Sequence, residues 1–462
     1  MSSQCCCARL VVDMSGNLVA SPRLKPQLGT GATIVLGLGS ILGTGVFVSL
    51  AIATAIAGTQ IFLALSLAAG LALCNALSAA QLAAAHPVNG GTYAYGYRYL
   101  HPYAGFVAGW VFLLAKSASA ATAALGLAAY FGGWWGYALP LPVVPTALVA
   151  VVVMTVIAAL GVRKSNWVNA AIVGWTLLGL GCFVVAGLGQ SVAPVDLTAA
   201  ARLTAVGLTP TGLPVGWNWG RLFQATALMF VAYAGYARIT TMTEEVRRPR
   251  RSIPIAMVVC LSLTLALYML VAGTLIDHWG TAQSLFSNTA LPPLSILVQQ
   301  FQTPWPLVEI VESSAIVALL GVLLNLVLGL SRVLLAMGRQ GDMPLQLAAL
   351  NRSRTTPTLA IWITGGLIAL LVTIGNVKTT WSFSAFNVLI YYTLTNLAAL
   401  RLSVSERRYP RWVSVIGLVG CLSLAFWVDR SVWQWGLLLI LLGCLWKAGR
   451  DFWARSAGGQ RG

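Results

Sequence analysis

The segment Gly37-Leu-Gly-Ser-Ile-Leu-Gly-Thr-Gly-Val-Phe47 lies in a long apolar run and contains four glycines within nine residues. Each glycine weakens a helix by roughly 1 kcal/mol relative to alanine. The glycines alone leave two interpretations open. Either they allow close packing between membrane helices, or the helix is unwound at Gly43-Thr44-Gly45. In the second case the N–H groups and the positive dipole end of the following half-helix would face an anion.

A later apolar run contains Met229-Phe-Val-Ala-Tyr-Ala-Gly-Tyr-Ala237, in which small residues stand between two tyrosines. Unwinding here would free carbonyl oxygens to accept hydrogen bonds from a cation such as an ammonium group. Tyr233 and Tyr236 would then flank a ligand, although ordinary packing aromatics would give the same pattern. Interruptions in a first and a sixth span are typical of an inverted repeat of five plus five helices.

The composition places both runs in a membrane protein. Of the 462 residues, 58% are hydrophobic and 8% are charged, whereas a soluble domain carries about 25% charged residues. Such a chain cannot cover itself with a water-compatible surface, which excludes a soluble enzyme, a disordered protein and a nucleic-acid-binding domain. The apolar runs are long and continuous rather than alternating, so they predict helices and not a barrel.

We therefore predict an all-α integral membrane protein, because a helix of about 20 apolar residues crosses the hydrocarbon. About twelve transmembrane helices are expected, at 31–58, 60–84, 103–131, 143–161, 167–189, 220–242, 253–276, 309–337, 358–375, 380–400, 412–428 and 431–447. The repeat would occupy 31–400, with spans 1–5 at 31–189 and spans 6–10 at 220–400. Residues 401–447 would add two accessory spans, and 1–30 and 448–462 would be tails.

The net charge of +17 is a topology signal. With the N-terminus inside, 23 of the 28 lysines and arginines fall on the cytoplasmic side, and four fall on the other: Arg202, Arg221, Lys378 and Arg430. By the positive-inside rule, both termini are cytoplasmic and the number of spans is even. We expect a multi-pass protein of the cell membrane, with the lipid bilayer and not nucleic acid as its partner.

Five motifs, in order along spans one to eight, resemble those of the amino acid–polyamine–organocation permeases, which have the leucine-transporter fold. They are Gly39-Ser-Ile-Leu-Gly-Thr-Gly-Val-Phe47, His86-Pro-Val-Asn-Gly-Gly-Thr-Tyr-Ala94, Gly105 through Trp110, Tyr233-Ala-Gly-Tyr236 with Glu244 through Pro254, and Ser331 through Pro344. The resemblance implies a permease that moves an amino acid by alternating access. Any one of these motifs is only moderately specific, but five in order are strong.

The resemblance also implies a substrate site. The substrate α-carboxylate would bind the amides around three residues: Gly43, Thr44 and Gly45. The α-amino group would bind carbonyl oxygens at or near four residues: Ile41, Ala232, Tyr233 and Gly235. Tyr233 or Tyr236 would close over the ligand. Some members that carry cationic amino acids have a glutamate near the position of Ala115, and no acidic residue occupies the middle of any predicted span. A neutral amino acid, small or apolar, is therefore expected.

Lys116 stands at the centre of the predicted third span, 13 residues from one end and 15 from the other. That is about 20 Å of helix, too far for its ammonium group to reach the interface. Ionisable groups at this depth commonly serve a function such as proton transfer. The alternative is a fixed ammonium group held by hydroxyls such as those of Ser117, Ser119 or Thr122.

The coupling ion stays open at this point. Proton-coupled members of the family can carry a lysine in span five, and the matching position here is Thr176, give or take one residue. Either Lys116 has taken over proton coupling, or Thr176 leaves room for a sodium ion or for exchange without a coupling ion. We favour proton coupling through Lys116, with a sodium-coupled symporter or an amino-acid exchanger as the alternatives.

Other classes fit the residues less well. An intramembrane enzyme needs a nucleophile with a base at depth, and an ATP-driven pump needs a Gly-rich nucleotide loop; neither pattern is found, so we predict no catalytic residues and no cofactor. The three histidines, His86, His101 and His278, are too dispersed to predict a metal site. Cys5, Cys6 and Cys7 indicate a reduced tail or an acylation or metal site. A non-transporting amino-acid sensor would have the same sequence features.

Overall fold

The computed structural model of the chain describes residues 10–12, 18–20, 29–86, 90–134, 142–161, 166–190, 216–241, 246–247, 249–279, 292–350 and 356–458. The predicted features at Cys5–Cys7, Glu244 and Glu245 lie outside these residues. A short antiparallel hairpin, β1 (Leu10–Val12) with β2 (Leu18–Ala20), belongs to the predicted N-terminal tail. The rest of the regular structure in the described residues is helical.

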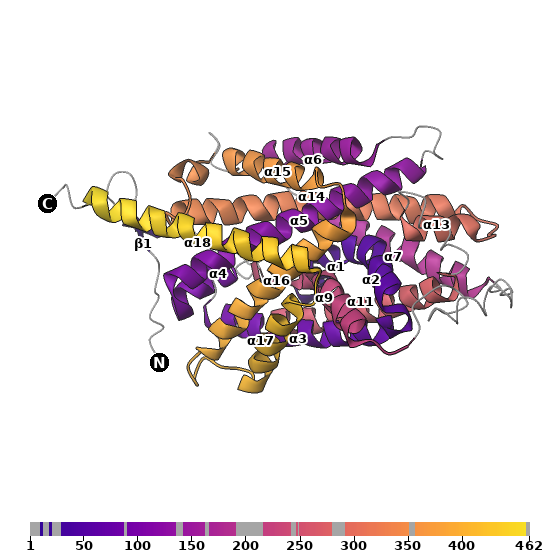
Figure 1. The fold of residues 1–462 in the computed structure, drawn as a ribbon, viewed down its shortest axis with the longest axis horizontal. Coiled ribbons are helices and arrows are strands. Elements are labelled where there is room, and N and C mark those ends of the chain that lie inside the picture. The colour runs from indigo at the N-terminus through magenta and orange to yellow at the C-terminus, as the bar shows by residue number, and fades with distance from the viewer. Residues whose placement is uncertain are drawn as a thin grey trace.

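The helices of the first half follow the predicted spans closely (Figure 1). They are α1 (Thr30–Ile41), η1 (Gly45–Ser49), α2 (Leu50–Ala57), η2 (Gly58–Gln60), α3 (Ile61–Ala85), α4 (Thr92–Tyr95), η3 (Gly96–Leu100), α5 (Pro102–Trp134), α6 (Val143–Ala159) and α7 (Asn166–Leu188). The short helices α4 and η3 lie between the second and third predicted spans.

The second half continues in the same manner, with one short helix between spans seven and eight. Its elements are α9 (Trp219–Tyr233), η4 (Ala234–Tyr236), α10 (Ala237–Thr241), α11 (Pro249–Asp277), α13 (Pro293–Gln300), α14 (Leu307–Arg339), η6 (Leu345–Ala348), α15 (Thr358–Val372), α16 (Val377–Leu400), α17 (Arg411–Ala425) and α18 (Arg430–Gly458). The last helix runs eleven residues past the predicted end at 447, so part of the predicted C-terminal tail is helical.

Seven helical stretches in the described residues are long and apolar enough to cross a membrane, and the first of them, Thr30–Ala85, contains α1 to α3. The chain is thus an all-helical membrane protein, apart from the hairpin. Three predicted spans are shorter than expected: α6 has 17 residues, and α15 and α17 have 15 each. Fifteen residues span about 23 Å, less than the hydrocarbon thickness of about 30 Å. Two of these helices end near glycines with positive φ, Gly161 (82°) and Gly375 (71°).

The buried side chains form two main clusters that meet along α5 and α14. The larger cluster unites α1, α2, α3, α9, α11 and α16, and the second unites α5, α6, α14 and α15. Figure 1 shows α6 and α15 along one edge of the molecule and α3 and α17 along the opposite edge. Elements that belong to the two clusters can therefore contact a common ligand where the clusters meet.

A buried carboxylate fixes one end of the molecule. Asp342 follows α14, and its side chain accepts hydrogen bonds from Tyr93 Oη (2.7 Å), Tyr97 Oη (2.6 Å) and Lys447 Nζ (2.8 Å). Trp446 donates to the Asp342 carbonyl oxygen (3.1 Å). Burial and the hydrogen bond to Asp342 raise the pKa of Tyr93 and of Tyr97, so both remain protonated donors. This end, where α14 and α18 finish, is called the terminal face below, and the opposite end the far face.

The Lys447–Asp342 ion pair should contribute strongly to stability. The Asp342 side chain is 0% exposed and that of Lys447 is 11% exposed, and removing one partner of a buried pair costs about 3–5 kcal/mol. We expect Lys447→Met to lower the thermal unfolding temperature of the purified protein in detergent. Lys447→Met combined with Asp342→Asn should recover part of the loss, since no unpaired charge is then buried.

The matched control is Lys378→Met. Lys378 pairs with Asp429 at 3.7 Å, but these side chains are 48% and 40% exposed, and exposed pairs contribute at most about 1 kcal/mol. A loss for Lys378→Met as large as that for Lys447→Met would contradict the role given to burial.

Candidate functional site

The first interrupted helix is built on glycines that no other residue can replace without movement. α1 ends at Ile41, Leu42 is extended (φ −75°, ψ 115°), and the π-helix η1 begins at Gly45. A Cβ atom at Gly43 would lie 2.5 Å from Val322 Cγ2 of α14, and one at Gly45 would lie 2.8 Å from Ala232 Cβ of α9. The first amides of a helix have no acceptor within it, so the start of η1 offers N–H groups at this point.

The second interruption touches the first. α9 ends at Tyr233, the 3₁₀ turn η4 follows, and α10 begins at Ala237. A Cβ atom at Gly235 would lie 2.5 Å from the Ser40 carbonyl carbon and 2.8 Å from the Ile41 nitrogen. The backbones of the two interrupted helices are therefore in direct contact, and only glycine allows this approach.

One hydroxyl group lies between the two interruptions. Tyr268 of α11 places its Oη 3.4 Å from the Ile41 carbonyl oxygen and 3.5 Å from the Ala232 carbonyl oxygen. Both distances exceed the usual 2.7–2.8 Å of a strong O–H···O hydrogen bond. Two carbonyl oxygens from separate helices thus converge on a single donor. The same arrangement can accept hydrogen bonds from an ammonium group.

Three further polar groups at the interruptions are buried without a hydrogen-bond partner among the described residues: Thr44 Oγ1, Tyr233 Oη and Tyr236 Oη. A buried donor or acceptor that lacks a partner costs about 1–3 kcal/mol, so such groups are uncommon unless they serve a ligand or water. The Tyr233 ring packs on Tyr268, with centroids 5.3 Å apart. Tyr236, also buried, packs on Tyr392 at 5.6 Å.

The burial of α14 changes along the side that lies against the first interruption. One face of α14 carries Ala315, Ala318, Val322, Asn325 and Gly329 at helical spacing. Ala315 and Ala318, on the far-face side of the interruption, are fully buried, whereas Val322, Asn325 and Gly329 are partly exposed. This face of α14 is therefore more exposed on the terminal side of the interruption than on the far side.

Lys116 is partly exposed within α5 and forms no hydrogen bond or ion pair with another described residue. Two of its expected partners are engaged elsewhere. Ser119 bonds to Ser384 (2.7 Å) and Thr122 to Thr380 (2.8 Å), both on α16. Nothing in the described residues thus holds the ammonium group in place, which leaves it available to a ligand or to water.

Thr176 is buried on α7, and its hydroxyl donates to the Ile172 carbonyl oxygen at 2.7 Å. It lies two turns beyond Asn169, on the same face of the helix. The Asn169 amide donates to the Val35 carbonyl oxygen of α1 (3.1 Å), so this face of α7 packs against the interrupted helix. No hydrogen bond joins Thr176 to Lys116.

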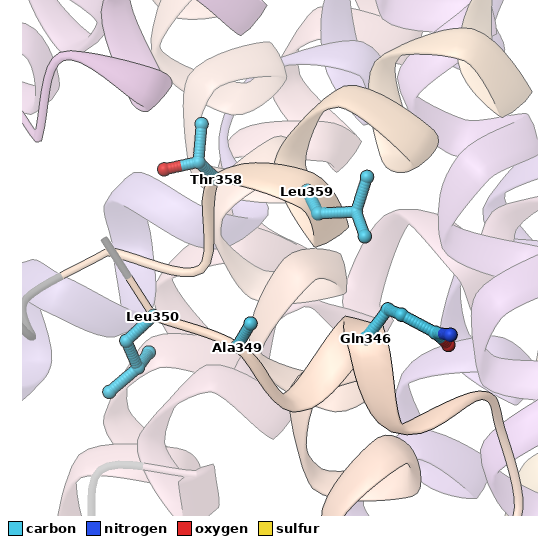
Figure 2. Close-up of a pocket in the computed structure, with 5 residues that line it drawn as sticks. All are labelled: Gln346, Ala349, Leu350, Thr358 and Leu359. Carbon is cyan, nitrogen blue, oxygen red and sulfur yellow. The ribbon is translucent and has the colours of Figure 1, made fainter. Parts of the chain in front are cut away.

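A shallow pocket of about 290 Å³ lies on the terminal face between η6 and the start of α15. Figure 2 shows its lining residues Gln346, Ala349, Leu350, Thr358 and Leu359. None of them carries a charge, and the pocket lies beyond the end of α14. It is separate from the interrupted helices and offers no chemistry comparable to theirs.

Sequence reasoning missed Tyr268. It stands in an apolar span with no glycine or charged residue beside it, and an isolated tyrosine there is indistinguishable from a packing aromatic. Sequence reasoning also gave Arg238 no role at the site, whereas it lies on α10, directly after the second interruption, and is partly exposed. The sequence places Arg238 three residues after Gly235, and this spacing indicates that it lies beside the second interruption.

Comparison with known proteins adds to this geometry. Residues 28–438 match the family model described as amino acid permease. An uncharacterized transporter of Mycobacterium tuberculosis is 39% identical over 411 residues, which are 88% of this chain and 87% of that protein. A branched-chain amino acid permease of Bacillus subtilis is 27% identical over 405 residues, 84% and 83% of the two chains. A methylthioribose transporter of the same organism is 24% identical over 438 residues, 89% and 90%.

Gly235→Ala should damage the contact between the interruptions. The added methyl group would meet backbone atoms of Ser40 and Ile41, which cannot rotate away as a side chain can. We expect destabilisation of about 3 kcal/mol, the upper end of overpacking costs, measured as a lower thermal unfolding temperature in detergent.

The control is Gly181→Ala on α7, where a Cβ atom would have nothing within 4 Å. Alanine there should stabilise the helix by about 0.5–1 kcal/mol. Equal unfolding temperatures for the two variants would contradict the close approach at Gly235.

Proposed function

Because the chain belongs to the amino acid permease family, we propose that it is a secondary active transporter of a neutral amino acid, coupled to protons. A family transporter of this kind is not an enzyme. The convergence of the Ile41 and Ala232 carbonyl oxygens on one donor, Tyr268 Oη, carries the proposal. The two carbonyl oxygens can accept hydrogen bonds from the amino group of an amino acid, and the free helix amides beside them can donate to its carboxylate.

Each end of the substrate has matching groups at the interruptions. The α-carboxylate binds the amides at Gly43, Thr44 and Gly45, where the helix N-terminus also favours negative charge. The α-amino group donates to the carbonyl oxygens of Ile41 and Ala232, with Tyr233 and Gly235 completing that wall. In this scheme the Tyr268 hydroxyl occupies the position of the ammonium group and gives way to it. Tyr236, which packs on Tyr392, holds these residues in place.

A neutral substrate suits the surrounding side chains. The described residues that contact the interruptions are apolar or hydroxyl-bearing, such as Val322, Ala318 and Tyr268. Ala115, where cationic-substrate relatives can carry an acid, is fully buried and offers no charge. A cationic side chain would therefore enter without a counter-charge.

The proposed architecture has twelve crossings. The core, 31–400, holds two inverted five-helix repeats with α1–α2 and α9–α10 as the interrupted members, and 401–447 adds two accessory spans. The short helices α6, α15 and α17 cross with the help of their flanking residues or by local thinning of the bilayer. Both termini are cytoplasmic, so the terminal face is the cytoplasmic face, and the partly exposed part of α14 beyond Val322 lies on the cytoplasmic side of the site.

We assign proton coupling to Lys116, which is partly exposed as a residue and forms no hydrogen bond or ion pair with another described residue. A sodium ion beside Thr176 would need several oxygen ligands, but the α14 residues at the level of Gly43 are Ala318 and Val322. Thr176 donates its proton to Ile172, which leaves its oxygen lone pairs as one side-chain ligand. This donor set suits sodium poorly.

Uptake into proteoliposomes tests the function. We expect a mixture of labelled neutral amino acids to accumulate under an inward proton gradient in sodium-free buffer, and a protonophore to abolish the accumulation. Lys116→Met should lose concentrative uptake while retaining exchange of labelled for unlabelled substrate, since binding and alternation do not need the coupling proton.

The control is Lys378→Met, which removes an exposed cation at the other end of the molecule and should accumulate substrate normally. Exchange by the wild-type protein without gradient-driven accumulation would identify an exchanger and overturn proton coupling. Accumulation that requires sodium would identify a sodium symporter. Binding without either flux would identify a sensor.

A further inference from the structure

The contacts between α5 and α16 fix the level of each residue along these two helices. Phe112 of α5 packs on Tyr391 of α16, with ring centroids 5.3 Å apart. Further along, Ser119 of α5 bonds to Ser384 of α16 at 2.7 Å. The two contacts are seven residues apart on each helix, and the residue numbers rise on α5 while they fall on α16. The helices are therefore antiparallel and keep one register over this stretch.

This register places Lys116 and Asn387 at the same level. Lys116 lies four residues after Phe112 on α5. Asn387 lies four residues before Tyr391 on α16. Residues four apart lie on one side of a helix, so both belong to the sides on which α5 and α16 meet. The ammonium group of lysine ends a flexible four-carbon stem, and rotation of the side chain can bring it to the amide.

The side chain of Asn387 offers an acceptor without a partner. Asn387 is fully buried, and its Nδ2 donates to the Phe383 carbonyl oxygen at 2.9 Å. Because a carbonyl oxygen only accepts, this bond identifies the amide nitrogen. The other amide atom, Oδ1, is buried and has no hydrogen-bond partner among the described residues. Leaving a buried acceptor unpaired is unfavourable, so Oδ1 is suited to a donor that reaches it.

Lys116 supplies the complementary group. Its ammonium group has three N–H donors and no acceptor, and it forms no hydrogen bond or ion pair with another described residue. A cation at this depth of a membrane protein is costly unless it is paired or hydrated. A charged donor and a neutral acceptor, both without a partner in the described part of the chain, thus stand at one level of one helix interface.

Few other charges lie near this level. Among the described residues, the charged and titratable groups around it are Tyr391 on α16, Arg332 on α14 and Arg238 on α10. Arg238 Nη1 would lie 3.3 Å from a Cβ atom at Gly329 of α14, and Arg238 is engaged in an interaction of its own. Helices α6 and α15 contain no titratable residue, and α18 contains none over 431–443. None of these groups is an acid, so a neutral acceptor remains for the ammonium group.

We propose that Asn387 is the positioning residue for the coupling proton: its Oδ1 accepts a hydrogen bond from the ammonium group of protonated Lys116 and stabilises that form until the proton is released. On release, the proton passes from Lys116 Nζ to water, and the electron pair of the broken N–H bond stays on the nitrogen. The inference rests on the proposed function for the use of the proton. The contact itself can be measured without transport.

The first test reads the protonation of Lys116 directly by NMR. The whole protein is prepared in detergent with carbon-13 at the lysine Cε position, where the chemical shift depends on the charge of the neighbouring Nζ. The chain contains only five lysines, so the signals can be separated. The Lys116→Met variant assigns the signal of Lys116 by its absence. This signal is then followed as a function of pH.

We expect Asn387→Leu, which keeps the approximate size of the side chain and removes the acceptor, to lower the midpoint of the Lys116 titration by about one pH unit, because an acceptor favours the charged form. Asn387→Asp places a carboxylate at the same point and should raise the midpoint. Equal midpoints in the wild-type protein and both variants, or a Lys116 signal that titrates in none of them, would overturn the proposal.

The matched control is Ser382→Ala. Ser382 lies on α16, is fully buried, and its Oγ has no hydrogen-bond partner among the described residues either. It stands five residues before Asn387, which places it on a different side of the helix. The titration midpoint of Lys116 should stay at its wild-type value in this variant. A shift equal to that of Asn387→Leu would contradict a specific contact with Asn387.

The second test reads the same contact in transport. At a constant pH difference across the proteoliposome membrane, the external pH that gives half-maximal uptake of labelled neutral amino acids should fall by about one unit in Asn387→Leu. Counterflow, which needs no coupling proton, should keep its wild-type rate. A slower counterflow with an unchanged pH profile would assign Asn387 a structural role only and overturn the proposal. A shifted Lys116 titration in a protein without proton-driven uptake would support the contact and overturn proton coupling instead.

Discussion

In a hydrocarbon environment every backbone hydrogen-bonding group needs a partner from the protein itself. Two helices of this chain are interrupted in their middle, so some of their backbone groups lose the partner that a continuous helix would supply. The remedy is a set of donors from neighbouring helices. Tyr268 lies at the Ile41 and Ala232 carbonyl oxygens, Tyr130 donates to Phe47 (2.9 Å), and Tyr392 reaches Ala234 (3.4 Å). Trp381 donates to Leu228 (3.0 Å). Aromatic side chains thus donate to carbonyl oxygens at the interruptions and in the helical turns beside them.

This requirement explains the arrangement around the site. The aromatic donors come from α5, α11 and α16, so these helices must surround the interruptions for the interruptions to exist at all. The carbonyl oxygens that remain weakly bonded, at Ile41 and Ala232, are those best placed for a ligand. The candidate site is therefore the part of the interrupted helices whose carbonyl oxygens have the longest hydrogen bonds to neighbouring side chains.

The sequence was sufficient for the helices and for the places where two of them break, because apolar length and glycine clusters are local properties. Gly43 and Gly45 by themselves allowed either close packing or a break, and the second small-residue step at Gly235 favoured the break. Tyr268 could not be found from the sequence, since the value of its hydroxyl depends on carbonyl oxygens more than 30 residues away in sequence. The short helices α6 and α15 were overestimated, since hydropathy does not report where Gly161 and Gly375 turn the chain.

The face of α14 that changes from buried to exposed at Val322 has an energetic consequence. A carrier that alternates must wet the other half of this face, where Ala315 and Ala318 are now dry. Each contributes a single methyl group, and hydrating a group of that size costs about 0.8 kcal/mol. Larger side chains there would hold the molecule in one state. With alanines, hydrating both positions costs only about 1.6 kcal/mol, an amount that the binding of a small solute is large enough to offset.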